Sequence, residues 1–259
     1  MAKRTSDDLR ADEGSLVPAL ERAPAAFDPY PEELRTCHRC PRLVGHRERM
    51  AREKRRAYRA EAYWGAPVPG FGDPGARLVI VGLAPGAHGS NRTGRMFTGD
   101  ASGDFLYPAL HRAELANQPD SRSRDDGLTL HGVWITAVAR CAPPGNRPTQ
   151  DELNACRPWL AYDLTGLTEA RAVMALGRIA HDGVLKLYRE RGLRTTLAAH
   201  PFRHGAVHRF DGLPGAEAAN VLPLVDAYHV SFQNTNTGRL TPEMFDAALA
   251  QAKALARLV

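Results

Sequence analysis

The chain has 259 residues, a formal net charge of +5 and a hydrophobic fraction of 43%, which is ordinary for a globular protein. No apolar run approaches the roughly 18 residues of a membrane span, and the N-terminus has no apolar core of a secretory signal. We therefore expect a cytoplasmic protein without membrane contact.

Polar residues dominate the start of the chain. Residues 1–25 are poorly periodic and predict a mobile tail, and we expect a single domain over residues 26–259. Residues 43–62 predict one basic helix, followed by a loop rich in glycine and proline. Between His46 and Arg59 there are seven basic and two acidic residues. This charge suits a phosphate backbone, although a solvated helix face would have the same composition.

Short apolar runs further along the chain predict a sheet. The first three are continuous rather than alternating, as in strands that are buried on both faces. Expected strands cover residues 77–83, 132–139, 171–177 and 219–229, and expected helices cover residues 103–116, 149–164, 177–191 and 241–258. This alternation indicates an α/β fold, here three α/β/α layers around a central, mainly parallel, four-stranded sheet.

Polar, glycine-containing loops follow three of these strands, over residues 82–100, 140–149 and 229–239. In sheets of this kind ligands bind outside the carboxyl ends of the strands. The three loops should therefore meet at one edge of the sheet and form a binding site.

The loop over residues 82–100 reads GLAPGAHGSNRTGRMFTGD. A glycine-rich turn after a strand can hold a nucleotide phosphate, but the spacing fits neither of the two common phosphate-binding patterns. An ordinary long loop is the alternative. Phe97, beside Gly99, offers a flat face to a planar ring such as a nucleobase.

Four cysteines are present, namely Cys37, Cys40, Cys141 and Cys156. Disulfides are rare in cytosolic proteins, and a redox use of the Cys-x-x-Cys pair leaves the two distant cysteines unexplained. Four thiolates can hold zinc or an iron–sulfur cluster, and their spacing does not distinguish the two.

The loop over residues 82–100, the stretch HVSFQNTNTGRL that begins at His229, and the four cysteines together resemble the family V uracil-DNA glycosylases of bacteria and archaea. The resemblance runs from about Thr36 to the C-terminus. It implies an α/β/α glycosylase fold, a [4Fe–4S] cluster held by the four cysteines, and removal of uracil and often of other damaged bases from DNA. We expect a monomer whose partner is DNA containing such bases.

The resemblance also assigns roles in the reaction. Phe97 stacks on the flipped base, the backbone of Ala84, Gly86 and Ala87 lines the floor of the pocket, and His229 donates to uracil O2. The first motif lacks a carboxylate at residues 86–88, so Asp100 is expected to act on the water, with Asn146 as a second polar contributor. Asp100 could instead only cap the helix that follows it.

Residues that contact DNA are expected on two loops. Phe232 or Gln233 could fill the gap left by the flipped nucleotide, and Arg239 could meet a phosphate. Asn91, Arg92 and Arg95 are further candidates for DNA or pocket contacts. Family IV relatives have an asparagine that reads uracil where this chain has Ala137, so we expect looser selectivity, with hypoxanthine among the accepted bases.

Two other classes remain possible on sequence grounds. A non-catalytic module that binds damaged DNA could have the same fold, but it would not need Asp100, Asn146 and His229 together. An iron–sulfur redox protein would release no base.

Overall fold

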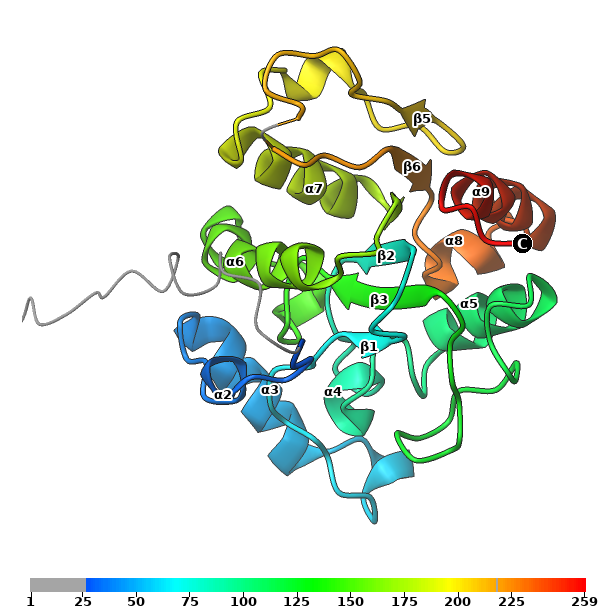
Figure 1. Cartoon of the computed structure of the whole chain (residues 1–259). Helices are drawn as coiled ribbons and strands as arrows, with labels where there is room; N and C mark the ends of the chain where they lie inside the picture. The colour runs from blue at the N-terminus through cyan, green and yellow to red at the C-terminus, as the bar shows by residue number, and fades with distance from the viewer. Residues whose placement is uncertain (1–26, 218) are drawn as a thin grey trace, which may run out of the picture.

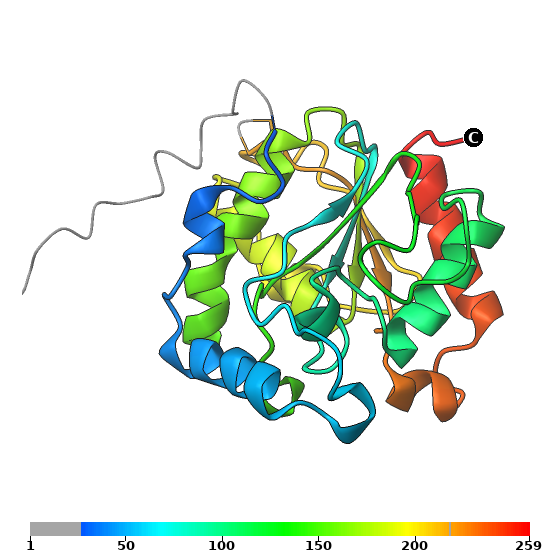
Figure 2. The ribbon, with the colours of Figure 1, turned by 90° about the horizontal axis from the view of Figure 1, so that it is seen from below.

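A computed structural model describes residues 27–217 and 219–259, so the tail expected over residues 1–25 lies outside the described part. The described chain is an α/β structure in which helices cover both faces of one sheet (Figure 1). A view turned by 90° shows the sheet between its two helical layers (Figure 2).

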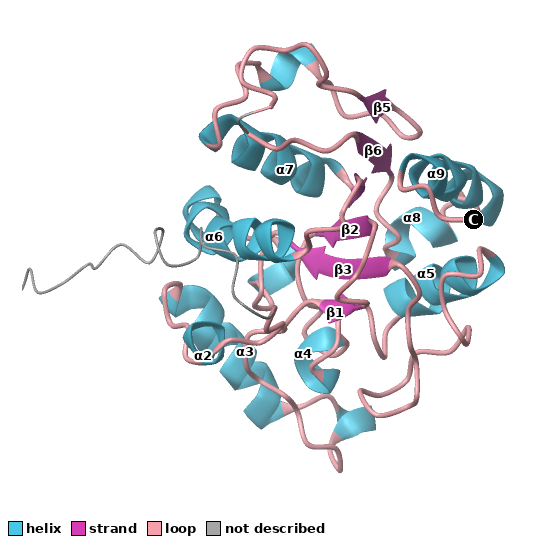
Figure 3. Cartoon of the chain, viewed as in Figure 1, coloured by secondary structure: helices cyan, strands magenta, loops and turns pink. Residues whose placement is uncertain are grey.

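The sheet has six strands in the order β1-β3-β2-β4-β6-β5, so the expected number of four is wrong. Central neighbours β3–β2, β2–β4 and β4–β6 pair in parallel, whereas the edge strands pair antiparallel. Their bounds are β1 Phe71–Gly72, β2 Leu78–Gly82, β3 Val133–Ala137, β4 Ala172–Leu176, β5 Val207–His208 and β6 Leu224–Ala227 (Figure 3).

Every residue of the four central strands is buried, which explains the continuous runs of β2, β3 and β4, whereas β6 also contains the buried Asp226. The edge strands have only two residues each, too short for a recognisable pattern. The last expected strand, residues 219–229, shrinks to β6 because the residues on either side of it leave the sheet.

Helices α5 (Ala101–Arg112) and α9 (Pro242–Leu255) cover one face of the sheet, and α6 (Gln150–Gly166) and α7 (Arg178–Glu190) cover the other (Figure 2). Side-chain caps begin three of them. Thr149 and Glu152 form a capping box on α6, Thr241 caps α9, and Asp100 caps α5.

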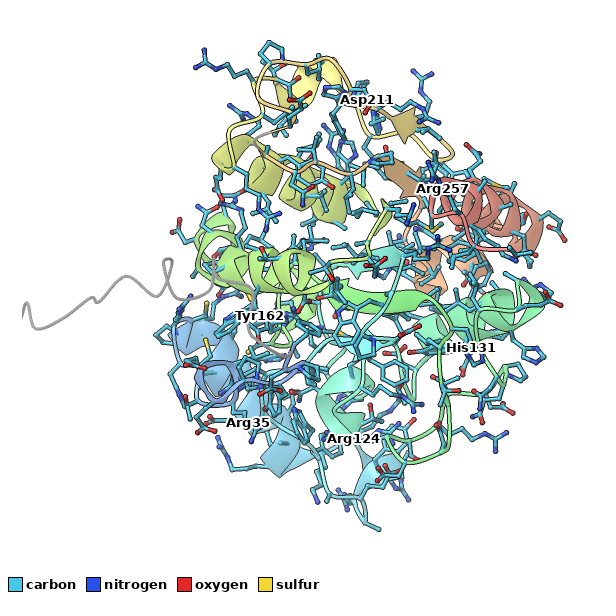
Figure 4. All side chains as sticks on the ribbon, viewed as in Figure 1. Arg35, Arg124, His131, Tyr162, Asp211 and Arg257 are labelled. Atoms are coloured by element: carbon cyan, nitrogen blue, oxygen red, sulfur yellow. The ribbon has the colours of Figure 1, made fainter. Side chains whose placement is uncertain are left out.

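The N-terminal segment packs beside α6. It consists of α2 (Glu32–Arg35), α3 (Pro41–Glu53) and a turn of 3₁₀ helix, η1 (Arg56–Tyr58). The single helix expected over residues 43–62 therefore ends early, at Lys54, whose φ of 52° no longer fits a right-handed helix. Tyr162 of α6, labelled in Figure 4, donates a hydrogen bond to the carbonyl of Asp28, just before α2, at 3.0 Å.

Carboxyl ends of the parallel strands lie side by side, because Gly82 pairs with Ala137 and Leu176 with Ala227. The loops that leave this edge contain short helical turns, namely α4 (Ser90–Thr93), η2 (Pro144–Asn146) and α8 (Phe232–Asn236), while η3 (Leu197–Ala199) lies elsewhere. Within the described residues, no helix is long and apolar enough to cross a membrane.

Candidate functional site

A cavity of about 550 Å³ lies at the carboxyl edge of the sheet, where the three polar loops meet. Among its lining residues are many of those predicted from sequence: Ala84, Gly86, Phe97, Asp100, Asn146, His229, Phe232 and Gln233. Ala137 lies in the wall as well. Of the predicted pocket residues, Ala87 is outside this lining, and its carbonyl accepts a hydrogen bond from Asn91 instead.

Asp100 lies in the cavity wall and is also the N-cap of α5. Its Oδ1 accepts hydrogen bonds from the backbone N–H of Ser102 at 3.0 Å and of Gly103 at 3.2 Å. Its Oδ2 faces Gly86, where an added Cβ would lie 2.8 Å from that oxygen. Burial raises the pKa of Asp100, and the two backbone hydrogen bonds only partly offset this. The two alternatives from sequence, helix cap and site carboxylate, are thus compatible.

Phe97 has a left-handed backbone conformation. Its φ of 51° is rare for a bulky side chain, and the ring is 8% exposed. The ring lies directly against Gly82 at the end of β2, since a Cβ on Gly82 would be 2.6 Å from Cζ of Phe97. Its centroid is 6.2 Å from that of His229. One flat apolar face and one imidazole therefore border the same space.

His229 is two residues beyond the end of β6. Asn234 of α8 donates a side-chain hydrogen bond to its carbonyl, at 2.8 Å, and fixes the turn there. Burial lowers the pKa of His229 to about 4. The ring is therefore neutral at neutral pH, with one nitrogen that donates and one that accepts.

The loop after β3 forms a third wall. Asn146 of η2 has a φ of 56° and an exposed side chain, and it lines the cavity together with its neighbours Gly145 and Arg147. A left-handed backbone is tolerated by asparagine better than by most residues. This conformation of Asn146 turns the loop toward the cavity.

The opposite rim is α8. Phe232 is 62% exposed, an unusual state for a large apolar side chain, and Gln233 beside it is exposed too. Arg239 is also exposed, and its guanidinium lies 4.8 Å from the ring centroid of Tyr228, next to His229. These positions fit the DNA contacts predicted for the loop.

Asn91, Arg92 and Arg95 do not fit their predicted role in DNA or pocket contacts, and this is a correction. All three are buried. Asn91 donates to the carbonyl of Arg47 at 3.1 Å, Arg92 pairs with Glu61, and Arg95 binds Asp126 through two hydrogen bonds of 2.7 and 2.8 Å. The polar side chains of this loop hold it together from inside.

Sequence reasoning missed several cavity residues. Ser90, Ser102, Ser231 and Arg147 all line it, and each lies next to or within two residues of a predicted position. Their place in the three carboxyl-edge loops was the available indication, but isolated serines are too common in loops to be selected on that basis.

All four cysteines line one small cavity between α2, α3, the loop after β3 and α6, and none is in a disulfide. Apolar side chains, among them Leu34 and Leu43, surround them. The backbone N–H of Arg140 donates to Sγ of Cys156 at 3.2 Å, and Nη1 of Arg47 donates to Sγ of Cys141 at 2.9 Å. Four thiolates placed in this way can bind a metal centre.

Two buried guanidinium groups beside the cysteines lack full sets of partners. Nε of Arg47 has no hydrogen-bond partner, and neither have Nε and Nη1 of Arg140, although Arg140 pairs with Asp163. Buried positive charge requires compensation. A negatively charged centre between the four sulfurs would supply it, so the surroundings suit an anionic cluster.

Another group of metal-ligating side chains lies away from the cavity, on β6, α7 and β5. His181, His208 and Asp226 are the only three in the described residues whose ligand atoms come within 4.8 Å of one another. They bind one another directly, because Asp226 accepts from His181 at 2.7 Å and from His208 at 2.9 Å.

Comparison with known proteins gives a consistent result. A family model described as the uracil DNA glycosylase superfamily matches residues 69–253. The chain is 55% identical to a type-5 uracil-DNA glycosylase of Thermus thermophilus, over 88% of this chain and 98% of that protein. It is 49% identical to a type-5 uracil-DNA glycosylase of Mycobacterium leprae (86% and 93% covered), and 36% identical to a type-4 uracil-DNA glycosylase of Pyrobaculum aerophilum (46% and 54% covered).

Proposed function

The chain belongs to the uracil-DNA glycosylase superfamily, and from this premise we propose that it removes uracil from DNA by hydrolysing the bond between base and sugar. Its activity is that of a uracil-DNA glycosylase in DNA repair, and it leaves an abasic site. The observation that supports this most strongly is the convergence of Phe97, Asp100 and His229 on one cavity at the carboxyl edge of the sheet.

Base recognition begins with flipping. A base inside a duplex is out of reach, so the nucleotide turns out of the stack and its base enters the cavity. Phe97 then offers its ring as a stacking surface, which replaces part of the stacking energy that the base loses. The rare backbone conformation of Phe97 places the ring against Gly82, where the base can slide over it.

His229 stabilises the leaving base. As the bond between C1′ and N1 breaks, its electron pair leaves with uracil, and negative charge develops on the ring oxygens. A neutral imidazole has one N–H, and by donating it to O2 the ring stabilises this charge. The low pKa of His229, about 4, keeps the ring in that neutral state.

Asp100 acts on the water. Because its Oδ1 is engaged by the N–H groups of Ser102 and Gly103, Oδ2 is the oxygen left to orient the nucleophile. The water oxygen bonds to C1′ as the base departs, and the water proton passes to the carboxylate. Positive charge on the sugar makes a weak base sufficient. Asn146, on the opposite wall, is a second polar contact for water or base.

The cavity also supports acceptance of bases larger than uracil. Ala137 offers only a methyl group where a reader of the uracil edge would stand, and the volume of about 550 Å³ leaves room for a purine. A site that forms few hydrogen bonds with its substrate discriminates weakly. We include hypoxanthine among the substrates for this reason.

The rim formed by α8 would face the duplex. Phe232 is exposed and apolar, as expected of a wedge that enters the base stack, while Gln233 and Arg239 are placed to meet bases or phosphates around it.

A [4Fe–4S] cluster held by Cys37, Cys40, Cys141 and Cys156 is the second part of the proposal. The incompletely partnered Arg47 and Arg140 suit the net negative charge of a thiolate-bound metal centre, and the resemblance to the iron–sulfur family V glycosylases supports the cluster over a zinc ion. When bound, the cluster is a structural crosslink and takes no part in hydrolysis. It would join α2 and α3 to the loop after β3, which forms one wall of the cavity.

Base release from duplex DNA containing one uracil tests the activity. The wild-type protein should release uracil and leave a site that alkali cleaves, whereas His229→Ala and Asp100→Asn should lose most of the rate. Binding of uracil-containing DNA without any release would contradict the proposal and favour a damage-binding module. Full activity of the Asp100→Asn variant would reduce Asp100 to a helix cap.

A further inference from the structure

Five exposed arginines lie on the second half of α3 and the turn that follows it, and we call them the arginine surface: Arg49, Arg52, Arg55, Arg56 and Arg59. Within the described part of the chain, none of them forms an ion pair with a carboxylate. Glu48 lies in the same stretch of chain, but its Oε1 pairs with Nη2 of the buried Arg47, at 3.9 Å.

A helix face that is merely solvated usually balances its charges with carboxylates three or four residues away. Glu48 and Glu53 stand at this spacing from Arg49, Arg52 and Arg56, but neither carboxylate forms an ion pair with any of these three arginines in the described structure. Packing does not account for it either, since α3 packs through another face, which contains Leu43 and Arg47. Uncompensated, exposed guanidinium groups are what a polyanion would bind.

The arginine surface is fixed next to the cavity. Asn91, beside the cavity residue Ser90, donates to the carbonyl of Arg47, and the guanidinium of Arg92 stacks on Tyr58 of η1 at 3.9 Å. At the other end of α3, Arg42 donates to the carbonyl of Arg147, a cavity residue, at 3.0 Å. Thus α3 and η1 run along one wall.

Figure 2 shows the same relation in space. The helix α3 and the turn η1 lie along the edge of the molecule toward which the central strands point, and α8 lies at that edge on the other side of α4. The cavity mouth is therefore bordered by an arginine-rich rim and by the rim that contains the exposed Phe232.

We propose that the arginine surface binds the phosphate backbone of the duplex on one flank of the flipped nucleotide. This rests on the proposed function, because it assumes that the flipped base occupies the cavity. The helical part of the surface, from Arg49 to the end of α3, extends on the order of 6 Å at the rise of a helix, and Arg55, Arg56 and Arg59 continue it beyond that end. Phosphates of one strand are spaced at about 3.4 Å along the duplex axis, so the surface can contact more than one of them.

The test replaces Arg49, Arg52 and Arg56 by glutamine in the otherwise intact chain. The ligand is a duplex with a tetrahydrofuran abasic analogue, which the enzyme cannot process. The dissociation constant is measured over a range of salt concentrations. Each lost phosphate contact should lower the slope of log affinity against log salt by about 0.9, so the triple variant should lose about 2 to 3 units of slope.

A matched control has the same change of charge at the opposite edge of the sheet, with Arg189, Arg194 and Arg209 replaced by glutamine. Arg189 lies in the last turn of α7, a helix that starts at the carboxyl end of β4 and runs back along the sheet. Arg209 follows β5, next to the amino end of β6. All three are exposed. The control should keep the salt slope and the affinity of the wild type.

Duplexes shortened on one side of the abasic analogue assign the flank. Wild type should lose affinity when one particular flank is shortened, and the Arg49, Arg52, Arg56 triple variant should be insensitive to that same shortening. Single-turnover release of uracil at saturating enzyme should be unchanged in this variant, because its arginines touch no reacting atom.

Two outcomes would overturn the proposal: a wild-type salt slope in the triple variant, or an equal loss in the control. Failure of the proposed function would look different. In that case wild type would release no uracil, whatever the arginine variants do to DNA affinity. Normal uracil release combined with an unchanged salt slope would refute the arginine surface alone.

Discussion

Replacing Gly89 by alanine adds one methyl group at the position where it should do most damage to the reaction. A Cβ on Gly89 would lie 2.6 Å from Cγ of Asp100 and 2.9 Å from its Cβ, and closer still to Oδ2. Carbon atoms in contact prefer about 3.5 to 4.0 Å, so the carboxylate must shift by about 1 Å. A shift of that size can cost about 10²-fold in rate, equivalent to about 2.7 kcal/mol in the activation free energy.

Single-turnover release of uracil by Gly89→Ala measures this cost, and affinity for the duplex with the abasic analogue should be unchanged. Gly75→Ala is the control, because the nearest atom to its Cβ is at an ordinary 3.4 Å and the residue lies before β2, at the far edge. In the Asp100→Ala background the Gly89 change should add much less, since both act through one carboxylate. A wild-type release rate in Gly89→Ala would refute the assignment of Asp100 to the water.

Further expectations concern protonation, the rim and the cluster. Asp100→Asn should lower uracil release by about 10²-fold or more, since it removes the base. Because burial raises the pKa of Asp100, the wild-type rate should rise with pH through that raised value, and the Asn variant should lack this step. An NMR titration should place the pKa of His229 near 4. Phe232→Ala should leave the free energy of unfolding unchanged, because the ring is exposed, but should slow release from duplexes more than from single strands. Burial by itself would raise the pKa of Asp226, but the hydrogen bonds from His181 and His208 outweigh it and lower the pKa. The ionised form therefore stabilises the fold above pH 3.8, its ordinary value, and this contribution is lost as pH falls through the lower folded value. Asp226→Asn should therefore destabilise the protein at neutral pH, and its difference from wild type should shrink in acid unfolding experiments. Cys156→Ala should lose iron, brown colour and thermal stability together, and retention of all three would contradict the cluster.

The central sheet could be predicted because its strands are buried on both faces. Continuous apolar runs such as residues 77–83 are typical of buried parallel strands when glycine-rich loops follow them. The two edge strands could not be predicted, because two residues have no period, and their pairing depends on neighbours far away in the chain. The end of α3 could not be predicted either, because it depends on the backbone conformation of Lys54, and a basic composition carries no information about that conformation.

Some site residues could be predicted from the sequence and others could not. Phe97 and Asp100 lie in the loop after β2, and His229 lies just beyond β6, so the strand order brings their segments to one edge. Their roles in the reaction came from the family resemblance. Arg92 and Arg95 occur in the same loop, but their ionic partners, Glu61 and Asp126, come from other segments. A polar, glycine-rich sequence looks exposed until those partners are known. The prediction therefore failed where burial of charge depends on long-range pairing.

The glycines of the loop after β2 support side chains of the site, a role different from phosphate binding. Side chains of the site rest directly on glycine Cα atoms, as Phe97 does on Gly82, Asp100 on Gly86 and Gly89, and His229 on Gly177, where an added Cβ would lie 3.2 Å from that of the histidine. Each contact removes one way in which the functional group could move. The glycines thus provide close, rigid support rather than flexibility, which is what positioning for a reaction at C1′ requires. In the loop after β2 the spacing of Gly82, Gly86 and Gly89 follows no phosphate-binding pattern, because it is set by the two side chains that they support, Phe97 and Asp100.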